Sequence, residues 1–220
     1  MSEPITNYSK DFLERFLKYC QSRKVFPIIV GGWAVYAYAQ SEYSVDVDFA
    51  LKNKKELEKL EPFFEKEGFT KEVNGGVSFV KQISKEGLGE YKLQHIIFDV
   101  TFYSDKHTLA ENQKIEVPWK LLENNTIQSA IEGLAVEIPN PELLLVYKVK
   151  ALADRQYRQA KLHSFYKKLS RKRLEFKIEK DKRDISNLIK KGRLNQKKLG
   201  EILAKTKFKS RFDQTIQPLQ

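Results

Sequence analysis

Residues 31–48, with the sequence GGWAVYAYAQSEYSVDVD, constrain the fold of this 220-residue chain more than any other segment. The apolar residues 25–30 before it predict a short buried strand that ends at Gly31 and Gly32. Residues 33–40 are rich in alanine and tyrosine and predict a helix that starts directly after the glycines. Because glycine has no Cβ, such a turn lets another group approach the backbone closely, and it leaves N–H groups free to bind an anion. The segment therefore predicts an α/β architecture with an anion-binding turn.

Two carboxylates follow on the next predicted strand, residues 45–51. Asp46 and Asp48 alternate there with apolar residues. Successive side chains of a strand point to opposite faces, so both carboxylates are predicted on one face, about 7 Å apart along the chain. Hard divalent cations prefer such oxygen ligands. An isolated Asp-x-Asp pair is more often an exposed polar strand face, so the pair alone names no reaction.

A third aspartate, Asp99, lies on the longest predicted strand, residues 91–103. Alternation places it with His95 on the face opposite Phe98 and Val100. For His95, an ordinary polar strand position is the more common role. Three carboxylates on adjacent strands beside a glycine turn form the kind of site that two-metal phosphoryl or nucleotidyl transfer requires.

Helical spacing, caps and turn residues predict the remaining elements. They are helices at 9–23 and 54–67, strands at 69–73 and 77–83 joined by Asn74-Gly75-Gly76, and helices at 141–153, 159–174, 178–191 and 195–205. Asn140 before Pro141 is a typical helix start. The predicted fold class is α/β, with a mixed sheet flanked by helices in residues 1–140 and a basic helical part in residues 141–220.

The charge is unevenly distributed along the chain. Residues 1–140 hold 17 lysines and arginines against 21 aspartates and glutamates, whereas residues 141–220 hold 23 against 8. A regional excess of this kind indicates a polyanionic partner such as nucleic acid, with a solvated helical surface as the alternative. Such cations would engage a phosphate backbone without sequence selectivity. The candidate contacts are Arg158, Lys161, Lys168, Arg171, Lys172 and Arg173.

Cysteine content and hydropathy exclude further classes of protein. Cys20 is the only cysteine, so an internal disulfide or a cysteine-based zinc site is excluded, and its helical spacing favours a core position. The longest uncharged run, residues 25–41, is too short and too interrupted for a membrane span. The first residues lack a signal-peptide pattern. We therefore expect a soluble, cytoplasmic protein that does not associate with membranes.

Three short motifs together resemble the signature of the nucleotidyltransferase fold of the DNA polymerase β superfamily. These are Val30-Gly31-Gly32-Trp33-Ala34, Ser44-Val45-Asp46-Val47-Asp48-Phe49 and Phe98-Asp99-Val100. Two later motifs resemble the AbiEii- and AbiGii-type toxin nucleotidyltransferases: the helix from Leu145 through Lys148 to Arg155, and Lys180-Asp181-Lys182-Arg183-Asp184-Ile185. The resemblance spans residues from about 25 to 190. Proteins of that type are toxins of toxin–antitoxin and phage-abortive systems, and some modify tRNA.

This resemblance implies the roles of the catalytic residues. Asp46, Asp48 and Asp99 would be the catalytic and metal-binding residues, holding two Mg²⁺ ions or Mn²⁺. Asp99 would also help to activate the acceptor hydroxyl. Gly31 and Gly32 would approach the β and γ phosphates of the nucleotide.

Further residues follow from the same resemblance. Ser44 occupies a position where the family has threonine or serine, and Lys148 would contact phosphate. For Lys148, an apolar-helix lysine that reaches solvent is an equal alternative. Asp181 and Asp184 would order the helical part or touch the nucleotide. Glu42 stands where many members carry arginine, a departure that bears on the substrate more than on the fold.

The resemblance thus implies Mg²⁺-dependent transfer of a nucleotide from an NTP, such as ATP, to an acceptor hydroxyl on RNA, tRNA in particular. An antitoxin protein would be a further partner. Two alternatives remain. One is a small-molecule nucleotidyltransferase of the kind that modifies aminoglycosides. The other is a non-catalytic nucleic-acid-binding or regulatory protein with a degenerate site.

Overall fold

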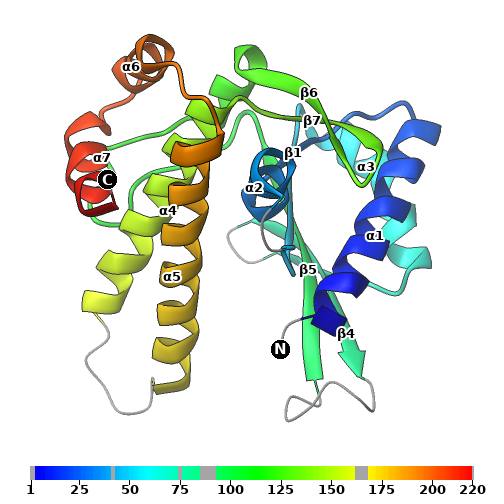
Figure 1. Cartoon of the computed structure of the whole chain (residues 1–220). Helices are drawn as coiled ribbons and strands as arrows, with labels where there is room; N and C mark the ends of the chain where they lie inside the picture. The colour runs from blue at the N-terminus through cyan, green and yellow to red at the C-terminus, as the bar shows by residue number, and fades with distance from the viewer. Residues whose placement is uncertain (1–2, 41–42, 74–75, 85–92, 162–167, 220) are drawn as a thin grey trace. The chain divides into compact units, whose positions relative to one another are not determined.

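The computed structural model describes residues 3–40, 43–73, 76–84, 93–161 and 168–219 (Figure 1). The chain folds into two compact units. The first comprises residues 1–104 and 126–139, and the second comprises residues 105–125 and 140–220. The predicted boundary at residue 140 lies where the sheet ends and the C-terminal helices begin. Residues 105–125 belong to the second unit, with the helices.

The first unit contains a seven-stranded mixed sheet with the strand order β3-β4-β5-β2-β1-β7-β6. The pairs β2–β5 and β1–β7 are parallel, and the other neighbouring strands are antiparallel. This confirms the predicted fold class. The strands are β1 (Ile28–Val30), β2 (Val47–Leu51), β3 (Thr70–Val73), β4 (Val77–Ser84), β5 (Leu93–Phe102), β6 (Thr126–Ile131) and β7 (Leu134–Pro139).

Three helices accompany the sheet: α1 (Glu3–Ser22), α2 (Gly31–Ala39) and α3 (Lys54–Lys66). Figure 1 shows α1 and α3 on one side of the sheet and α2 on the other. Helix α1 buries Phe12, Leu13, Phe16, Leu17 and Cys20, which confirms the core position predicted for Cys20. The predicted hairpin is present because β3 and β4 pair antiparallel from Val73↔Val77, although Asn74 and Gly75 of its turn lie outside the described residues.

Aromatic packing fixes which face of the sheet is buried. Phe16 of α1 lies 4.9 Å from the ring of Phe49 on β2 and 5.2 Å from the ring of Phe98 on β5. All three side chains are fully buried. Since side chains alternate along a strand, Asp48 and Asp99 must point to the opposite face of the sheet from these rings. The aromatic core beneath α1 therefore directs the two carboxylates away from itself.

The second unit consists of helices and the segment 105–125, which contains the 3₁₀ helix η1 (Trp119–Asn124). Within this unit, Asn140 links the 105–125 segment to the first of the helices. Its side-chain oxygen accepts a hydrogen bond from the Leu143 N–H at 2.9 Å, the predicted helix cap. Its own N–H donates to the Asn125 carbonyl at 2.7 Å. The helices are α4 (Pro141–Ala160), α5 (Lys168–Lys191), α6 (Gln196–Ala204) and α7 (Lys209–Ile216), followed by the 3₁₀ turn η3 (Gln217–Leu219).

Helix α5 corrects one prediction. The sequence predicted separate helices at 159–174 and 178–191, whereas α5 continues through residues 174–178 without a break. Neither glycine nor proline occurs between residues 168 and 191, so nothing in the backbone interrupts the helix before Gly192. Residues 162–167 of the predicted 159–174 helix lie outside the described residues. None of the helices in the described part of the chain combines the length and apolar character that a bilayer span needs.

His107 anchors the 105–125 segment through its ring. Its ring packs at a tilt against Trp119, with ring centres 5.1 Å apart, and Trp119 packs in the same way against Tyr147 of α4 at 4.4 Å. Its Nδ1 atom is buried without a hydrogen-bond partner among the described residues. Burial lowers the pKa of His107 to about 4, with a smaller contribution from the charge of Lys150, while Asp154 acts in the opposite direction. His107 is therefore neutral in the folded protein near pH 7.

We expect acid to destabilise the protein through this histidine. An unfolded chain binds a proton at His107 below a pKa of 6.5, whereas the folded chain binds it only below about 4. The stability that depends on neutral His107 is thus complete above pH 6.5 and falls between pH 6.5 and 4, by about 3 kcal/mol. Urea unfolding across this range should show a shallower pH dependence for His107→Gln than for the wild type. His95→Gln, at an exposed position on β5, is the matched control, and equal slopes for both variants would contradict the prediction.

Candidate active site

Strands β2 and β5 bring two of the three predicted aspartates together. They are parallel neighbours, and Asp48 lies directly opposite Asp99 in their register. Residues paired in this way are about 5 Å apart and project from the same face. Asp99 is exposed and Asp48 is partly exposed. The two carboxylates therefore share one accessible face of the sheet and are close enough to reach one cation.

Asp46 lies outside this pair. Strand β2 begins at Val47, two residues later than predicted, and Asp46 occupies a bend just before it. The strand alternation that predicts a shared face for Asp46 and Asp48 therefore does not extend to Asp46. Within the described ranges, no three His, Cys, Asp or Glu side chains gather into a group that could hold a metal ion. The role of Asp46 as a metal ligand stays a prediction.

Gly31 is required by the carboxylate of Asp48. It follows Val30, which pairs with Asp48 in the antiparallel β1–β2 register. Its φ is +63°, a conformation that favours glycine. A Cβ at this position would lie 1.9 Å from Asp48 Oδ2. The group that closely approaches the backbone at this turn is thus the carboxylate of Asp48, a part of the protein itself.

The N-terminus of α2 can bind an anion, and the negatively charged carboxylate of Asp48 already lies beside it. The helix begins at Gly31, its N-cap Val30 provides no side-chain hydrogen bond, and Gly32 in its first turn is buried. A carboxylate near a helix N-terminus is stabilised by the helix dipole. A phosphate added beside Asp48 would be repelled by it unless a cation lay between the two. With the oxygen donors of Asp48 and Asp99, these residues fit a hard divalent cation next to a phosphate.

We expect Gly31→Ala to impair the site more than the fold. The added methyl group must displace the Asp48 carboxylate and hold a left-handed backbone, at a cost of about 1–2 kcal/mol for the backbone alone. Thermal unfolding would measure that cost. Gly133→Ala is the matched control, because Gly133 also has a positive φ, 78°, but its Cβ would meet no atom within 4 Å. If both variants lost the same stability and the same activity, contact with Asp48 would not be the reason for glycine at position 31.

Ser78 is a site residue that the sequence did not reveal. It lies opposite Asp99 in the antiparallel β4–β5 register, and its hydroxyl donates a hydrogen bond of 2.5 Å to Asp99 Oδ1. The bond fixes one carboxylate oxygen of Asp99. Alternation alone could place Ser78 on a strand face, but only the pairing of β4 with β5 brings it to Asp99.

A second group missed from the sequence surrounds Glu132 in the turn between β6 and β7. The hydroxyls of Tyr36 and Tyr43 donate to Glu132 Oε1 at 2.6 and 3.0 Å, and Lys10 Nζ lies 2.8 Å from Oε2. The hydrogen bonds from Lys10 and Tyr36 lower the pKa of Glu132. Tyr43 immediately precedes Ser44, which is buried. The cluster thus ties Tyr43, just ahead of the aspartates, to the β6–β7 turn.

Lys148, a predicted nucleotide contact, lies in the helical unit among buried charges. Its ammonium is 2.6 Å from Asp184 Oδ2 and 3.7 Å from Asp181 Oδ1, and its side chain is 9% exposed. Arg155 also pairs with Asp181. The two aspartates therefore join α5 to α4, in keeping with the ordering role proposed for them. Phosphate contact by Lys148 stays a prediction.

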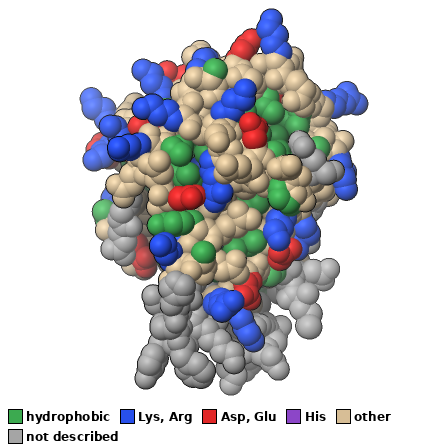
Figure 2. Space-filling model, turned by 90° about the vertical axis from the view of Figure 1, so that its left-hand side faces the viewer, with side chains coloured by type: hydrophobic (Ala, Val, Ile, Leu, Met, Phe, Trp, Pro, Cys, Tyr) green, Lys and Arg blue, Asp and Glu red, His purple; other side chains and the backbone are tan. Residues whose placement is uncertain are grey.

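The cations predicted to meet nucleic acid lie on two helices of the same unit. Arg158 is near the end of α4 and Lys161 directly after it, and both are exposed. Arg171 and Lys172 are exposed on α5. The side chains of Lys168 and Arg173 are outside the described part. Figure 2 shows Lys and Arg side chains projecting from much of the face it draws.

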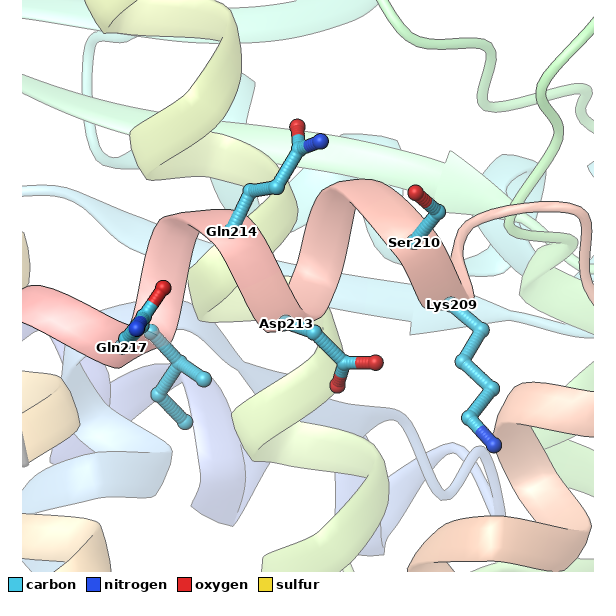
Figure 3. Close-up of a pocket in the computed structure, with 6 residues that line it drawn as sticks. Lys209, Ser210, Asp213, Gln214 and Gln217 are labelled. Carbon is cyan, nitrogen blue, oxygen red and sulfur yellow. The ribbon is translucent and has the colours of Figure 1, made fainter.

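A hollow of about 790 Å³ lies along α7 in the helical unit. Figure 3 shows Ser210 and Gln214 projecting from one side of this helix, and Lys209 and Asp213 from the other. The hollow is lined by Lys209, Ser210, Asp213, Gln214, Ile216 and Gln217. None of the residues predicted for catalysis or nucleotide binding is among them.

No family model and no curated protein matches the sequence. Several solved structures match its fold. The crystal structure of ANT(2'')-Ia in complex with adenylyl-2''-tobramycin matches with a TM-score of 0.54 and 15% identity, over 92% of this chain and 98% of that one. The solution structure of the antibiotic-resistance factor ANT(2'')-Ia gives a TM-score of 0.52 at 16% identity, over 94% of each chain. A nucleotidyltransferase-like protein from Paracoccidioides brasiliensis, described as antigenic, gives 0.50 at 16%, over 99% of this chain and 92% of that one.

The chain has a nucleotidyltransferase-like fold. This confirms the fold that the resemblance of the three motifs implied. The AbiEii-type assignment is finer than these matches and stays a prediction. At 15–16% identity the likeness concerns the fold, so the chemistry rests on the residues of this chain.

Proposed function

We propose that this protein is a nucleotidyltransferase that transfers a nucleotide from an NTP to an acceptor hydroxyl on RNA. The observation that carries the proposal is the pairing of Asp48 with Asp99 on adjacent parallel strands, beside a glycine that leaves room for the Asp48 carboxylate. This arrangement lies in a fold shared with nucleotidyltransferases. A strand face with only a structural role would need neither the glycine beside Asp48 nor the exposed Asp99 carboxylate opposite Asp48.

The reaction forms one bond and breaks one. The acceptor oxygen bonds to the α-phosphorus of the NTP, the bond from that phosphorus to the bridging oxygen of the β-phosphate breaks, and pyrophosphate leaves. The acceptor hydroxyl loses its proton as it attacks. Asp99 is the group proposed to receive or orient that proton, since it is exposed while Ser78 holds one of its oxygens in place.

Asp48 and Asp99, together with Asp46 two residues before Asp48, are proposed to hold Mg²⁺ or Mn²⁺. A divalent cation bound there supplies charge neutralisation for the triphosphate and lowers the pKa of a bound hydroxyl. The residues of the chain itself would position the nucleotide. Gly31 and Gly32 offer backbone N–H groups at the start of α2 to the phosphates, and the buried Ser44 lies just ahead of the carboxylates. Rate would come from orientation and preorganised charge.

RNA is the favoured acceptor because of the basic C-terminal part. The exposed cations at the end of α4 and on α5 would bind a phosphate backbone through charge alone. We further propose tRNA as the RNA class and a role as the toxin of a toxin–antitoxin pair. Both proposals rest on the motifs at 145–155 and 180–185, which resemble the AbiEii type.

A small-molecule acceptor is the second candidate, and the likeness to ANT(2'')-Ia favours it. That protein was solved with adenylyl-2''-tobramycin, and the match covers nearly the whole of both chains. Aminoglycosides are polycations, however, and a region with 23 basic against 8 acidic residues would repel them. Charge complementarity therefore ranks RNA first.

A labelling experiment separates these functions. Purified protein would be incubated with Mg²⁺ and each of the four α-labelled NTPs, once with total tRNA and once with tobramycin. Label at RNA 3′ ends supports the proposal, and label on tobramycin alone assigns the small-molecule function instead. If neither acceptor gains label and the protein does not label itself, the enzyme function is contradicted. Calorimetry with NTP and Mg²⁺ would then distinguish a non-catalytic RNA-binding protein, which should bind RNA but not NTP.

A further inference from the structure

Phe176 on α5 is a large aromatic side chain that the fold leaves in solvent. It is 62% exposed, in contrast to the buried aromatic core of the first unit. Lys172, Glu179 and Arg183 are exposed on the same helix, at offsets of −4, +3 and +7 from it. Residues at such offsets share one face of a helix. Phe176 therefore lies in an exposed stripe with Lys172 one turn before it, Glu179 one turn after it and Arg183 two turns after it.

The acidic residues of α5 do not cancel the charge of this stripe. Asp181 and Asp184 are only 2% and 6% exposed, and they pair with Lys148 and Arg155 of α4. Glu179 lies 2.7 Å from Lys182.

The other glutamate of the helix is paired as well. Glu175 lies 3.2 Å from Arg171, one turn earlier on α5. The four acidic side chains of α5 are thus either buried or paired with a neighbouring cation. The exposed surface around Phe176 is basic.

We propose that Phe176 is a stacking platform for an unpaired base of single-stranded RNA, with Lys172 and Arg183 contacting the flanking phosphates. The inference rests on the proposed RNA acceptor and adds the kind of RNA segment that is bound. An exposed aromatic ring offers its face to any base, and cations on either side match the phosphates that flank that base. A base inside a duplex is already stacked on its neighbours and cannot use the ring. The surface therefore selects a single-stranded end or loop over a duplex.

Fluorescence anisotropy tests this without nucleotide, so its outcome does not depend on the transfer reaction. The probes are a fluorescein-labelled 12-nucleotide oligouridylate and a 12-base-pair RNA duplex. Phe176→Ala should weaken binding of the single strand about tenfold and leave duplex binding unchanged. Phe176→Tyr should bind as the wild type does. The matched control is Phe26→Ala, since Phe26 is 69% exposed in the sheet unit, and it should change neither affinity.

Salt dependence separates the ring from the cations. Phe176→Ala should keep the wild-type slope of log affinity against log salt because no phosphate contact is lost. Lys172→Ala should reduce that slope by about 1. Phe176→Trp gives a direct readout, because indole emission is quenched when a base stacks on it.

Three results would overturn the proposal. One is equal single-strand affinity of the wild type and Phe176→Ala. Another is an equal loss on single strand and duplex. The third is a wild-type dimer in sedimentation that Phe176→Ala dissociates without an effect on RNA, which would assign the ring to a second copy of this chain. None of these results would bear on nucleotide transfer, which the labelling experiment tests separately.

Discussion

Replacing Asp48 by asparagine is expected to abolish nucleotide transfer, with a loss of at least a thousandfold, while the fold is retained. Asparagine has the shape of aspartate and fits the space that Gly31 leaves. It removes one negative charge from the face that Asp48 shares with Asp99. Cation binding depends on that charge, and charge stabilisation is the main source of rate in phosphoryl transfer. A thousandfold loss corresponds to about 4 kcal/mol of transition-state stabilisation.

The measurement is the rate of label transfer from NTP to RNA, with thermal unfolding measured in parallel. Asp99→Asn should show a comparable loss. Asp11→Asn is the matched control, because Asp11 is an exposed carboxylate on α1 of the same unit. Transfer by Asp48→Asn at the wild-type rate would remove the carboxylate pair from the mechanism. A loss of activity together with a lower unfolding temperature would assign Asp48 a structural role.

Replacing Lys148 by methionine is expected to destabilise the protein by about 3–5 kcal/mol. The Lys148 ammonium is buried and lies within ion-pair distance of both Asp181 and Asp184. Methionine fills a similar volume but leaves the buried Asp184 carboxylate with the more distant ammonium of Lys180, 3.4 Å away. An uncompensated buried charge is costly, whereas removal of both partners is far less so. The double variant Lys148→Met/Asp184→Leu should therefore recover much of the lost stability.

Urea unfolding measures these differences, and an exposed ion pair on α5 provides the control. Lys182 lies 2.7 Å from Glu179, nearly the distance in the buried pair, but these side chains are 38% and 58% exposed. Lys182→Met should cost less than about 1 kcal/mol. If Lys148→Met were as stable as Lys182→Met while the KM for NTP rose, Lys148 would be a phosphate contact and the ion pairs would be incidental. That result would support the role implied by the family resemblance.

Local sequence patterns were sufficient to predict the strands that carry the candidate site and the start of α4. The apolar residues on either side of the aspartates identified both strands, and the faces assigned to Phe98 and Asp99 are those observed, buried and exposed. Asn140 before Pro141 identified the start of α4, because a cap depends on bonds to residues only three positions away. At Gly31 the backbone does approach another group closely, the Asp48 carboxylate, whereas the predicted approach of the glycine pair to phosphate stays a prediction. These features follow from periods of 2 and 3.6 residues and from short-range bonds.

Predictions that depended on element ends were less accurate. Strand β2 starts at Val47, so Asp46 is outside it, and α5 passes through the break predicted at 174–178. The end of an element depends on packing and on bonds to other segments as well as on propensity. Local residue preference could not place these ends.

Only the tertiary structure decided which residues meet. The motif resemblance implied that Asp48 and Asp99 share a site, but no local pattern gives the register that sets Asp99 opposite Asp48. Nor does any local pattern predict that Ser78 bonds to Asp99 or that Glu132 gathers two tyrosines and a lysine. These contacts join residues 21 to more than 100 positions apart, and many strand orders satisfy the same local patterns. The sequence by itself thus determined the chemical groups and the faces they occupy. The order and register of the strands, set by the packing of the aromatic core, determined the pairing of those groups into a candidate site.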